Sequence, residues 1–121
     1  MKILILEDNE QRIEFFNRVY KNHKLFITSD INTAVSYVQN NEFDILFLDH
    51  DLELENFKAL TEGRTGYDFC KVLVEYKLQR QATIFIHSMN PVGGAVMERI
   101  LRDNGYEAQW VPFHLLRQEE R

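Results

Sequence analysis

The stretch "DILFLDHDLE", residues 44–53, joins an apolar run directly to three residues that can bind a metal ion or transfer a proton. The four residues before Asp49 are continuously apolar, which is typical of a β-strand covered on both faces. Asp49, His50 and Asp51 follow that run without a spacer. A buried strand that ends in two carboxylates and an imidazole indicates a functional site at its end.

The same alternation of apolar runs and helical periodicity extends along the chain in both directions. Further strands are predicted at residues 2–6, 24–28, 83–88 and 106–111. Helices are predicted over residues 9–21, from a cap at Ser29 or Asp30, over residues 66–78, and from the cap Asn90 to the stop signal Gly105. Residues 53–65 lack periodicity and are expected to form a long loop, whereas residues 113–121 predict only a short terminal helix.

Five strand–helix units with continuously apolar strands predict an α/β fold, a doubly wound five-stranded parallel sheet with helices on both faces. Right-handed crossovers favour the flavodoxin-like strand order 2-1-3-4-5, here with a truncated last helix. A chain of 121 residues can build one hydrophobic core, so residues 1–121 are expected to form a single domain.

The composition limits the classes of partner that the chain can bind. With 19 acidic and 14 basic residues the formal net charge is −5, which argues against binding to long duplex nucleic acid but allows a small phosphorylated ligand or a nucleic-acid end. Cys70 is the only cysteine, so no disulfide within the chain is expected and a cytoplasmic location is favoured. No apolar run predicts a signal peptide or a membrane span.

Polar residues stand at the carboxyl ends of three of the predicted strands: Glu7 and Asp8 at the first, Asp49, His50 and Asp51 at the third, His87 and Ser88 at the fourth. In doubly wound sheets the ligand lies beyond the carboxyl ends of the strands, at the switch point between strands 1 and 3. These residues are therefore expected at one rim of the sheet.

Carboxylates crowded at one rim repel one another unless a cation lies between them. Glu7, Asp8, Asp49 and Asp51 therefore predict a site for a hard divalent ion, with Mg²⁺ favoured over Mn²⁺. The alternative for Glu7 and Asp8 is that they cap the helix that follows.

Two histidines, His50 and His87, are expected beside this ion. Imidazoles at the ends of neighbouring strands can serve as general base and general acid. The alternative is that each one is a structural hydrogen-bonding group. His23 and His114 lie in connecting or terminal segments and are expected at the surface or in structural roles.

The segment "HSMNPVGGAVM", residues 87–97, offers a place for a phosphate. Free amides at a helix start bind anions, and Gly93 and Gly94 would let a phosphate approach closely, or would only let the helix pack tightly. Asn90 either caps the helix or hydrogen-bonds the ligand. Arg64, in the long loop, either holds a phosphate or is solvated.

These motifs resemble the receiver domain of two-component response regulators over nearly the whole chain. The similar segments are "ILILEDN" (3–9) with its acidic pair, "DILFLDHDL" (44–52) ending in the phospho-accepting aspartate, "TGYDFCKVL" (65–73) and "WVPF" (110–113). The resemblance implies a CheY-like fold. It also implies that Glu7, Asp8 and Asp49 bind Mg²⁺ through their side chains, and Asp51 through its backbone carbonyl.

The chain departs from ordinary receivers at three positions. His87, or Ser88 in the neighbouring register, stands where receivers have Thr or Ser at the end of the fourth strand. Val111 stands in place of the lysine before the proline, and Ala108 falls near the switch aromatic. The lysine holds the phosphorylated state in receivers, so its loss argues against ordinary phosphorelay signalling.

These departures resemble the cyclic-phosphate-processing receiver family. The matching features are "DHDL" (49–52), the long loop, and the pattern of His87, Ser88, Asn90, Gly93 or Gly94, and Met97. The resemblance implies hydrolysis of a cyclic phosphate on a nucleotide or RNA end. A metal on Asp8 and Asp49 would polarise the phosphoryl group, and one histidine would activate water while the other protonates the leaving hydroxyl. Attack by Asp49 itself is a second route.

Two other interpretations are open. The chain is alternatively a non-enzymatic pseudo-receiver that binds a protein partner or a second copy of itself. An exposed apolar patch in the C-terminal segment would favour this, made of Trp110, Phe113, Leu115 and Leu116. A conventional phospho-accepting receiver is the less favoured interpretation, because the lysine is missing.

Overall fold

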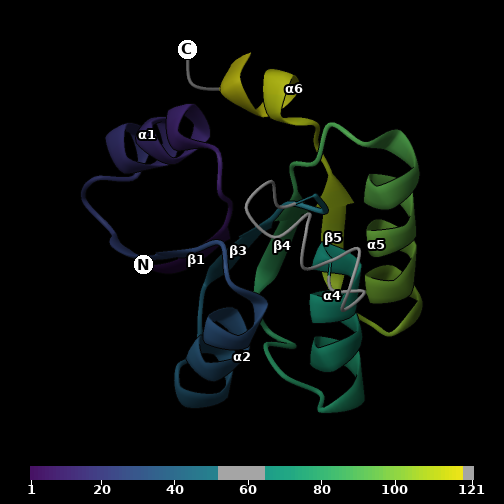
Figure 1. Cartoon of the computed structure of the whole chain (residues 1–121). Coiled ribbons are helices and arrows are strands. Elements are labelled where there is room, and N and C mark those ends of the chain that lie inside the picture. The colour runs from purple at the N-terminus through teal and green to yellow at the C-terminus, as the bar shows by residue number, and fades with distance from the viewer. Residues whose placement is uncertain (52–64, 119–121) are drawn as a thin grey trace.

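The computed structural model describes residues 1–51 and 65–118, in which strands and helices alternate along the chain (Figure 1). The elements are β1 (Lys2–Leu6), α1 (Glu10–Val19), β2 (Lys24–Thr28), α2 (Ile31–Asn40), β3 (Ile45–Leu48), α4 (Gly66–Glu75), β4 (Thr83–Ile86), α5 (Pro91–Asp103), β5 (Glu107–Trp110) and α6 (Phe113–Gln118). Each predicted strand is present, and the short terminal helix is as well. The predicted α/β class is confirmed.

The strands form one parallel sheet in the order β2-β1-β3-β4-β5, which confirms the predicted order. β1 lies between β2 and β3, with Ile5 beside Ile27 on one side and Phe47 on the other. The chain therefore changes from one half of the sheet to the other between β1 and β3. This is the switch point at which ligands bind in such sheets.

Helices cover both faces of the sheet, with α1 and α6 on one face and α2, α4 and α5 on the other (Figure 1). On the α1–α6 face, Ile3, Ile5 and Phe47 of the strands belong to one core cluster with Phe16 and Phe113. The alternate strand residues point to the opposite face and form the second core cluster. Burial on both faces explains why the strands are continuously apolar.

Each of the longer helices begins at a side chain that accepts a backbone N–H: Asn9, Asp30, Thr65 and Asn90. Asp30 rather than Ser29 is thus the cap of α2. Thr65 and Asp68 form a reciprocal capping box at the start of α4. These caps place the helix starts next to the carboxyl ends of the strands.

The helices end slightly earlier than the sequence periodicity predicts. α4 ends at Glu75 rather than Leu78, since Lys77 takes a left-handed backbone conformation with a φ of 54°. α5 ends at Asp103, and Gly105 turns the chain with a φ of 87°. None of the helices in the described ranges combines the length and the hydropathy that crossing a membrane requires.

Candidate metal and phosphate site

A small pocket of about 130 Å³ lies at the carboxyl ends of β1, β3 and β4. We call it the acid pocket; its lining residues are Glu7, Asp8, Asn9, Arg12, Asp49, Asp51, Ser88, Met89 and Asn90. The switch point of the sheet thus brings together residues from three separate segments. All four carboxylates expected at this rim line the pocket.

The backbone beneath the acid pocket is fixed by the sheet. The N–H of Glu7 donates to the carbonyl of Thr28, that of Asp49 to Leu6, and that of His87 to Leu48. The parallel ladder therefore continues one residue past each strand end. The side chains of the site extend from a rigid backbone.

Glu7 is buried, with 1% of its surface exposed. Its Oε2 accepts the N–H groups of Asp8 and Asn9 at 3.0 Å each, and its Oε1 lies 2.8 Å from Nε2 of His87. Burial by itself raises the pKa of Glu7, but the hydrogen bond and charge of His87, with the Asn9 amide and Arg12, bring it below its usual value. Glu7 is thus held as a carboxylate with both oxygens engaged.

Asp49 is also buried, but its surroundings have the opposite effect on its charge. Its Oδ1 accepts the backbone N–H of His50 at 2.8 Å, and its Oδ2 lies 3.6 Å from Nη1 of Arg12. Burial, with a contribution from the Glu7 charge, raises the pKa of Asp49 to about 6, although His87 and Arg12 lower it. The charge of Asp49, unlike that of Glu7, is therefore only partly compensated by the protein.

Arg12 is the cation that sequence reasoning missed. Its Nη1 lies 3.6 Å from both Glu7 Oε1 and Asp49 Oδ2, and its guanidinium stacks 5.1 Å from the ring of Phe113. The side chain is 24% exposed, so it can also meet a ligand. A signal was available: Arg12 lies in the first turn of α1, where a positive charge opposes the helix dipole.

His87 lies behind Glu7 and does not line the acid pocket. A carboxylate can only accept, so Nε2 of His87 donates to Glu7. The ring packs edge-on against Phe16 and Phe113, and Nδ1 is the only fully buried side-chain nitrogen or oxygen of the described residues without a hydrogen-bond partner. The contacts of His87 are those of the structural alternative, and direct proton transfer to substrate stays a prediction.

His50 belongs to a second carboxylate–imidazole pair at the rim. Its Nδ1 lies 2.9 Å from Oδ1 of Asp51, and Asn90 donates to the other oxygen of Asp51 at 3.1 Å. The His50 ring lies against Gly93, where an added Cβ would be 2.5 Å from the ring. Asp51, whose side chain is 52% exposed, is the member of the pair that lines the pocket.

The two glycines of α5 make packing contacts. The N–H of Gly93 donates to Oδ1 of Asn90 and that of Gly94 to its carbonyl, while the indole of Trp110 lies against Gly94. The described contacts are thus those of the packing alternative, and phosphate binding at these glycines stays a prediction. Ser88 lines the pocket and accepts the N–H of Asn90 at 3.0 Å.

The start of α4 lies directly against the backbone of β3. The N–H of Gly66 donates to the carbonyl of His50 at 3.0 Å, and a Cβ at residue 66 would overlap the Asp49 carbonyl. Only glycine fits this close approach. Arg64 and all but the last residue of the predicted loop 53–65 lie outside the described residues.

The acid pocket has the donors that a divalent ion requires. Glu7 and Asp49 offer oxygen atoms within 4.8 Å of each other and of His87, which lies behind them, and Asp8 and Asp51 line the same pocket. A set made mainly of carboxylate oxygens fits Mg²⁺ or Mn²⁺. The residues present therefore fit the cation that the sequence predicts.

Of the four C-terminal residues whose joint exposure would favour a protein partner, two are buried and one is half-buried. Phe113 and Leu116 are buried in the α1–α6 core cluster, and Nε1 of the half-buried Trp110 donates to the Ser88 carbonyl at 2.8 Å. Leu115 alone of the four is exposed. These side chains hold the last helix and strand in place, so binding of a partner through them stays a prediction.

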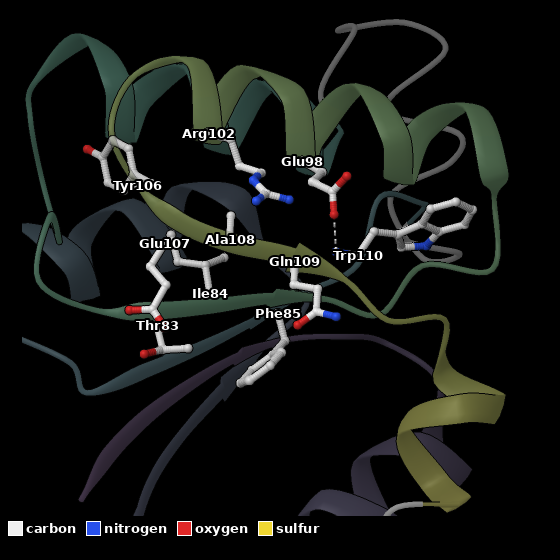
Figure 2. A pocket seen from close by; sticks show the side chains of 10 residues that line it. All are labelled: Thr83, Ile84, Phe85, Glu98, Arg102, Tyr106, Glu107, Ala108, Gln109 and Trp110. Atoms are coloured by element: carbon white, nitrogen blue, oxygen red, sulfur yellow. Dashed lines mark hydrogen bonds between the residues drawn. The ribbon is translucent and has the colours of Figure 1, made fainter.

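A larger hollow of about 520 Å³ lies along the outer edge of β5, beneath α5 (Figure 2). This β5–α5 hollow shares no lining residue with the acid pocket. In it, a carboxylate oxygen of Glu98 accepts the backbone N–H of Trp110 at 2.7 Å. The acidic side chain thus covers an amide of the edge strand.

Comparison with known proteins identifies relatives of this arrangement. The sequence profile of the family described as "Cyclic-phosphate processing Receiver domain" matches residues 2–103. A search of curated proteins found no match.

Solved receiver structures share the fold. The receiver domain of a sensor histidine kinase from Pseudomonas aeruginosa, determined with a magnesium ion in its active-site cleft, has a TM-score of 0.70 at 17% identity, covering 98% of this chain and 88% of that chain. A response regulator from Thermotoga maritima in complex with Mg²⁺-BeF has 0.65 at 14%, covering 98% and 94%. A CheY-like receiver from Methanospirillum hungatei has 0.69 at 10%, covering 98% and 85%.

Proposed function

The chain belongs to the cyclic-phosphate processing receiver domains, and from this membership we propose that it is a divalent-metal-dependent phosphoesterase acting on a cyclic phosphate of a nucleotide or RNA end. One observation carries the proposal. Asp49 and Glu7 are buried side by side in the acid pocket, and this raises the pKa of Asp49 to about 6. A divalent cation between them would stabilise both charges, and a pocket of about 130 Å³ suits an ion with one phosphate group.

The carboxylates of the acid pocket would have different roles in metal binding. The side chains of Asp8 and Asp49, with the backbone carbonyl of Asp51, would hold Mg²⁺ or Mn²⁺ directly. Glu7, whose two oxygens already accept hydrogen bonds, would stabilise the positive charge of the ion from behind Asp8 and Asp49. The magnesium ion in the active-site cleft of the Pseudomonas aeruginosa receiver domain supports the choice of this metal. When bound, the ion supplies Lewis-acid polarisation of the phosphoryl oxygen.

The remaining groups of the pocket orient substrate and move protons. Arg12 and Ser88 would hydrogen-bond phosphoryl oxygens. Asp51, oriented by His50 and Asn90, would take a proton from the attacking water. The new bond joins the water oxygen to phosphorus and one ribose C–O–P ester bond breaks at phosphorus. The leaving oxygen becomes a hydroxyl by taking a proton from solvent, and Asp51 returns the proton that it accepted to solvent. His87 keeps Glu7 ionised and in place.

Turnover of cyclic nucleotides tests the proposal directly. The full chain is incubated with 2′,3′-cyclic nucleotides or cyclic-phosphate-ended RNA in Mg²⁺ or Mn²⁺, and linear monophosphate is measured. We expect turnover by the wild type, none by Asp49→Asn, and unchanged turnover by the surface control Asp103→Asn, whose residue only pairs with Arg99 on α5. Absence of product with either metal, from protein that binds the metal, would remove the enzyme proposal for this substrate class.

The His50–Asp51 pair has a separate test. His50→Ala should lower kcat by about 100-fold, the scale of one proton-transferring group, while Mg²⁺ affinity stays unchanged. Equal turnover by His50→Ala and wild type would reject the role of this pair. Stable labelling of Asp49 by a small phosphodonor would instead favour the route in which Asp49 attacks phosphorus.

A non-enzymatic role as a binding domain is the second candidate. It is favoured by Val92 and Val96, which lie one turn apart on α5 and are 73% and 42% exposed. Exposed apolar side chains at this spacing are typical of a helix that meets a partner. Measurement of molar mass by light scattering, for wild type and Val92→Asp/Val96→Asp, tests whether α5 pairs with a second copy.

A further inference from the structure

The acid pocket is too small to hold a whole nucleotide. Its volume is about 130 Å³, whereas sites for ligands of that size usually measure about 300–1,000 Å³. Under the proposed function, on which this inference rests, the substrate must therefore extend beyond the pocket. The question is which neighbouring surface receives the rest of it.

One hollow shares lining residues with the acid pocket. A groove of about 440 Å³ lies between α1 and α6, and Asn9 and Arg12 line both this groove and the acid pocket. The larger β5–α5 hollow has no lining residue in common with the acid pocket. A substrate bound at Asp49 would thus reach the α1–α6 groove past Arg12.

The α1–α6 groove has the charge that a phosphate requires. Its ionisable lining residues are Arg12, Arg18, Arg117 and the single acid Glu14, in a chain whose net charge is −5. Basic residues concentrated on one surface of an acidic chain indicate an anionic ligand. Arginine is the side chain whose planar donors match phosphate oxygens.

Two of these guanidinium groups lie on an aromatic floor. Arg12 lies 5.1 Å from the ring of Phe113, and Arg18 lies 5.8 Å from the ring of Phe15. The two rings are themselves in contact, with centroids 5.1 Å apart. Cation–π contact orients each guanidinium before a ligand arrives, which lowers the entropy lost on binding.

We infer that the α1–α6 groove binds a second phosphate group of the substrate, through Arg18 and Arg117, while Arg12 separates it from the phosphate at Asp49. The second phosphate is either the 5′-phosphate of the same nucleotide or the phosphodiester that joins the neighbouring nucleotide of an RNA end. Arg12 and Arg18 are six residues apart, or about 9 Å along the axis of α1, which allows two separate phosphates.

Equilibrium binding of reaction products tests this inference without requiring turnover. With Mg²⁺ saturating, dissociation constants are measured by calorimetry for adenosine 3′-monophosphate, adenosine 3′,5′-bisphosphate and a 3′-phosphorylated adenine dinucleotide. We expect at least tenfold tighter binding of a two-phosphate ligand than of the monophosphate. The ligand that shows this advantage identifies the source of the second phosphate.

A double variant tests whether the two-phosphate advantage arises in the α1–α6 groove. Arg18→Gln/Arg117→Gln should abolish the advantage and leave the affinity for adenosine 3′-monophosphate unchanged. The matched control, Arg99→Gln/Arg102→Gln, removes the same charge from α5 and should retain the advantage. Equal affinities of all three ligands, an advantage that survives in the groove variant, or no measurable binding of either two-phosphate ligand would overturn the inference.

The two proposals fail differently. Turnover of cyclic nucleotides without a two-phosphate advantage would support the proposed enzymatic function and reject phosphate binding in the α1–α6 groove. The opposite result is a two-phosphate advantage that is lost in the groove variant of a protein without turnover. It would support phosphate binding in the α1–α6 groove and reject the proposed enzymatic function.

Discussion

The acid pocket and the β5–α5 hollow both contain carboxylates, but these carboxylates have opposite effects on the stability of the fold. In the acid pocket Asp49 and Glu7 are buried together, and burial with their mutual repulsion raises the pKa of Asp49 to about 6. In the hollow, Glu98 caps a backbone amide of the edge strand (Figure 2). The charge of Asp49 therefore opposes stability and is available for chemistry, whereas Glu98 supports the fold. The volume of a cavity does not indicate which of the two regions is the functional site, since the β5–α5 hollow is larger than the acid pocket.

The largest expected effect is on metal affinity in the acid pocket. Asp49→Asn removes a charged ligand, so we expect Mg²⁺ affinity, measured by calorimetry, to fall at least about 100-fold, or about 2.7 kcal/mol. Glu98→Gln, the same change in the hollow, should leave Mg²⁺ affinity unchanged. Equal losses in both variants would show that the two regions are not independent.

The next largest effect is on stability, at the buried partner of Glu7. His87→Ala leaves Oε1 of the buried Glu7 carboxylate without the donor Nε2, so we expect the free energy of unfolding to fall by about 3 kcal/mol. Denaturation by urea measures this loss. His114→Ala, an exposed histidine on α6, should change stability by less than about 0.5 kcal/mol. A stability of His87→Ala within that range would mean that His87 is not what compensates Glu7.

Stability against pH isolates the charge of Asp49. Its pKa is about 6 in the folded protein against an ordinary 3.8, so the folded state favours the protonated form and loses stability as pH rises from 4 to 6. Two pH units correspond to about 3 kcal/mol at most, and we expect Asp49→Asn to recover about 2 kcal/mol in metal-free buffer.

Unfolding of wild type and Asp49→Asn in chelator, between pH 4 and 8, measures this difference. It should be near zero at pH 4, increase through pH 6 and stay constant above. Saturating Mg²⁺ should stabilise the wild type alone. A difference independent of pH would refute the view that the Asp49 charge opposes the fold.

The smallest effect is expected in the β5–α5 hollow. Glu98→Ala removes the acceptor of the Trp110 amide, which should lower stability by about 1 kcal/mol at pH 7. Glu107→Ala, which removes an acidic residue from the same hollow, is the control and should have a smaller effect. A gain in stability from Glu98→Ala would remove the contrast with Asp49→Asn.

The fold was largely predictable, because its determinants are local. Continuous apolar runs specify strands buried on both faces, and short helix-forming segments between them specify right-handed crossovers. The cap Asn90 was readable from residue type, whereas residue type left the cap of α2 open between Ser29 and Asp30. The predicted fourth strand, residues 83–88, was too long, since β4 ends at Ile86.

The candidate site was predictable in its carboxylates and less so in its basic groups. Topology alone brings the residues that follow β1, β3 and β4 to one rim. The direction of a side chain depends on packing, so the sequence could not show that His87 lies behind Glu7 or that the His50 ring lies on Gly93. Arg12 reaches the pocket from the first turn of α1. The distance between that turn and the pocket is determined only by how α1 packs on the sheet.

The contact of Gly66 with β3 has a consequence for how the acid pocket tolerates mutation. The carbonyl of His50 accepts the N–H of Gly66, and a Cβ at residue 66 would overlap the carbonyl of Asp49. Any other residue at this position would have to displace either the start of α4 or the backbone of Asp49, because backbone atoms cannot turn aside as a flexible side chain can. The placement of the Asp49 carboxylate thus depends on a residue that has no functional group of its own.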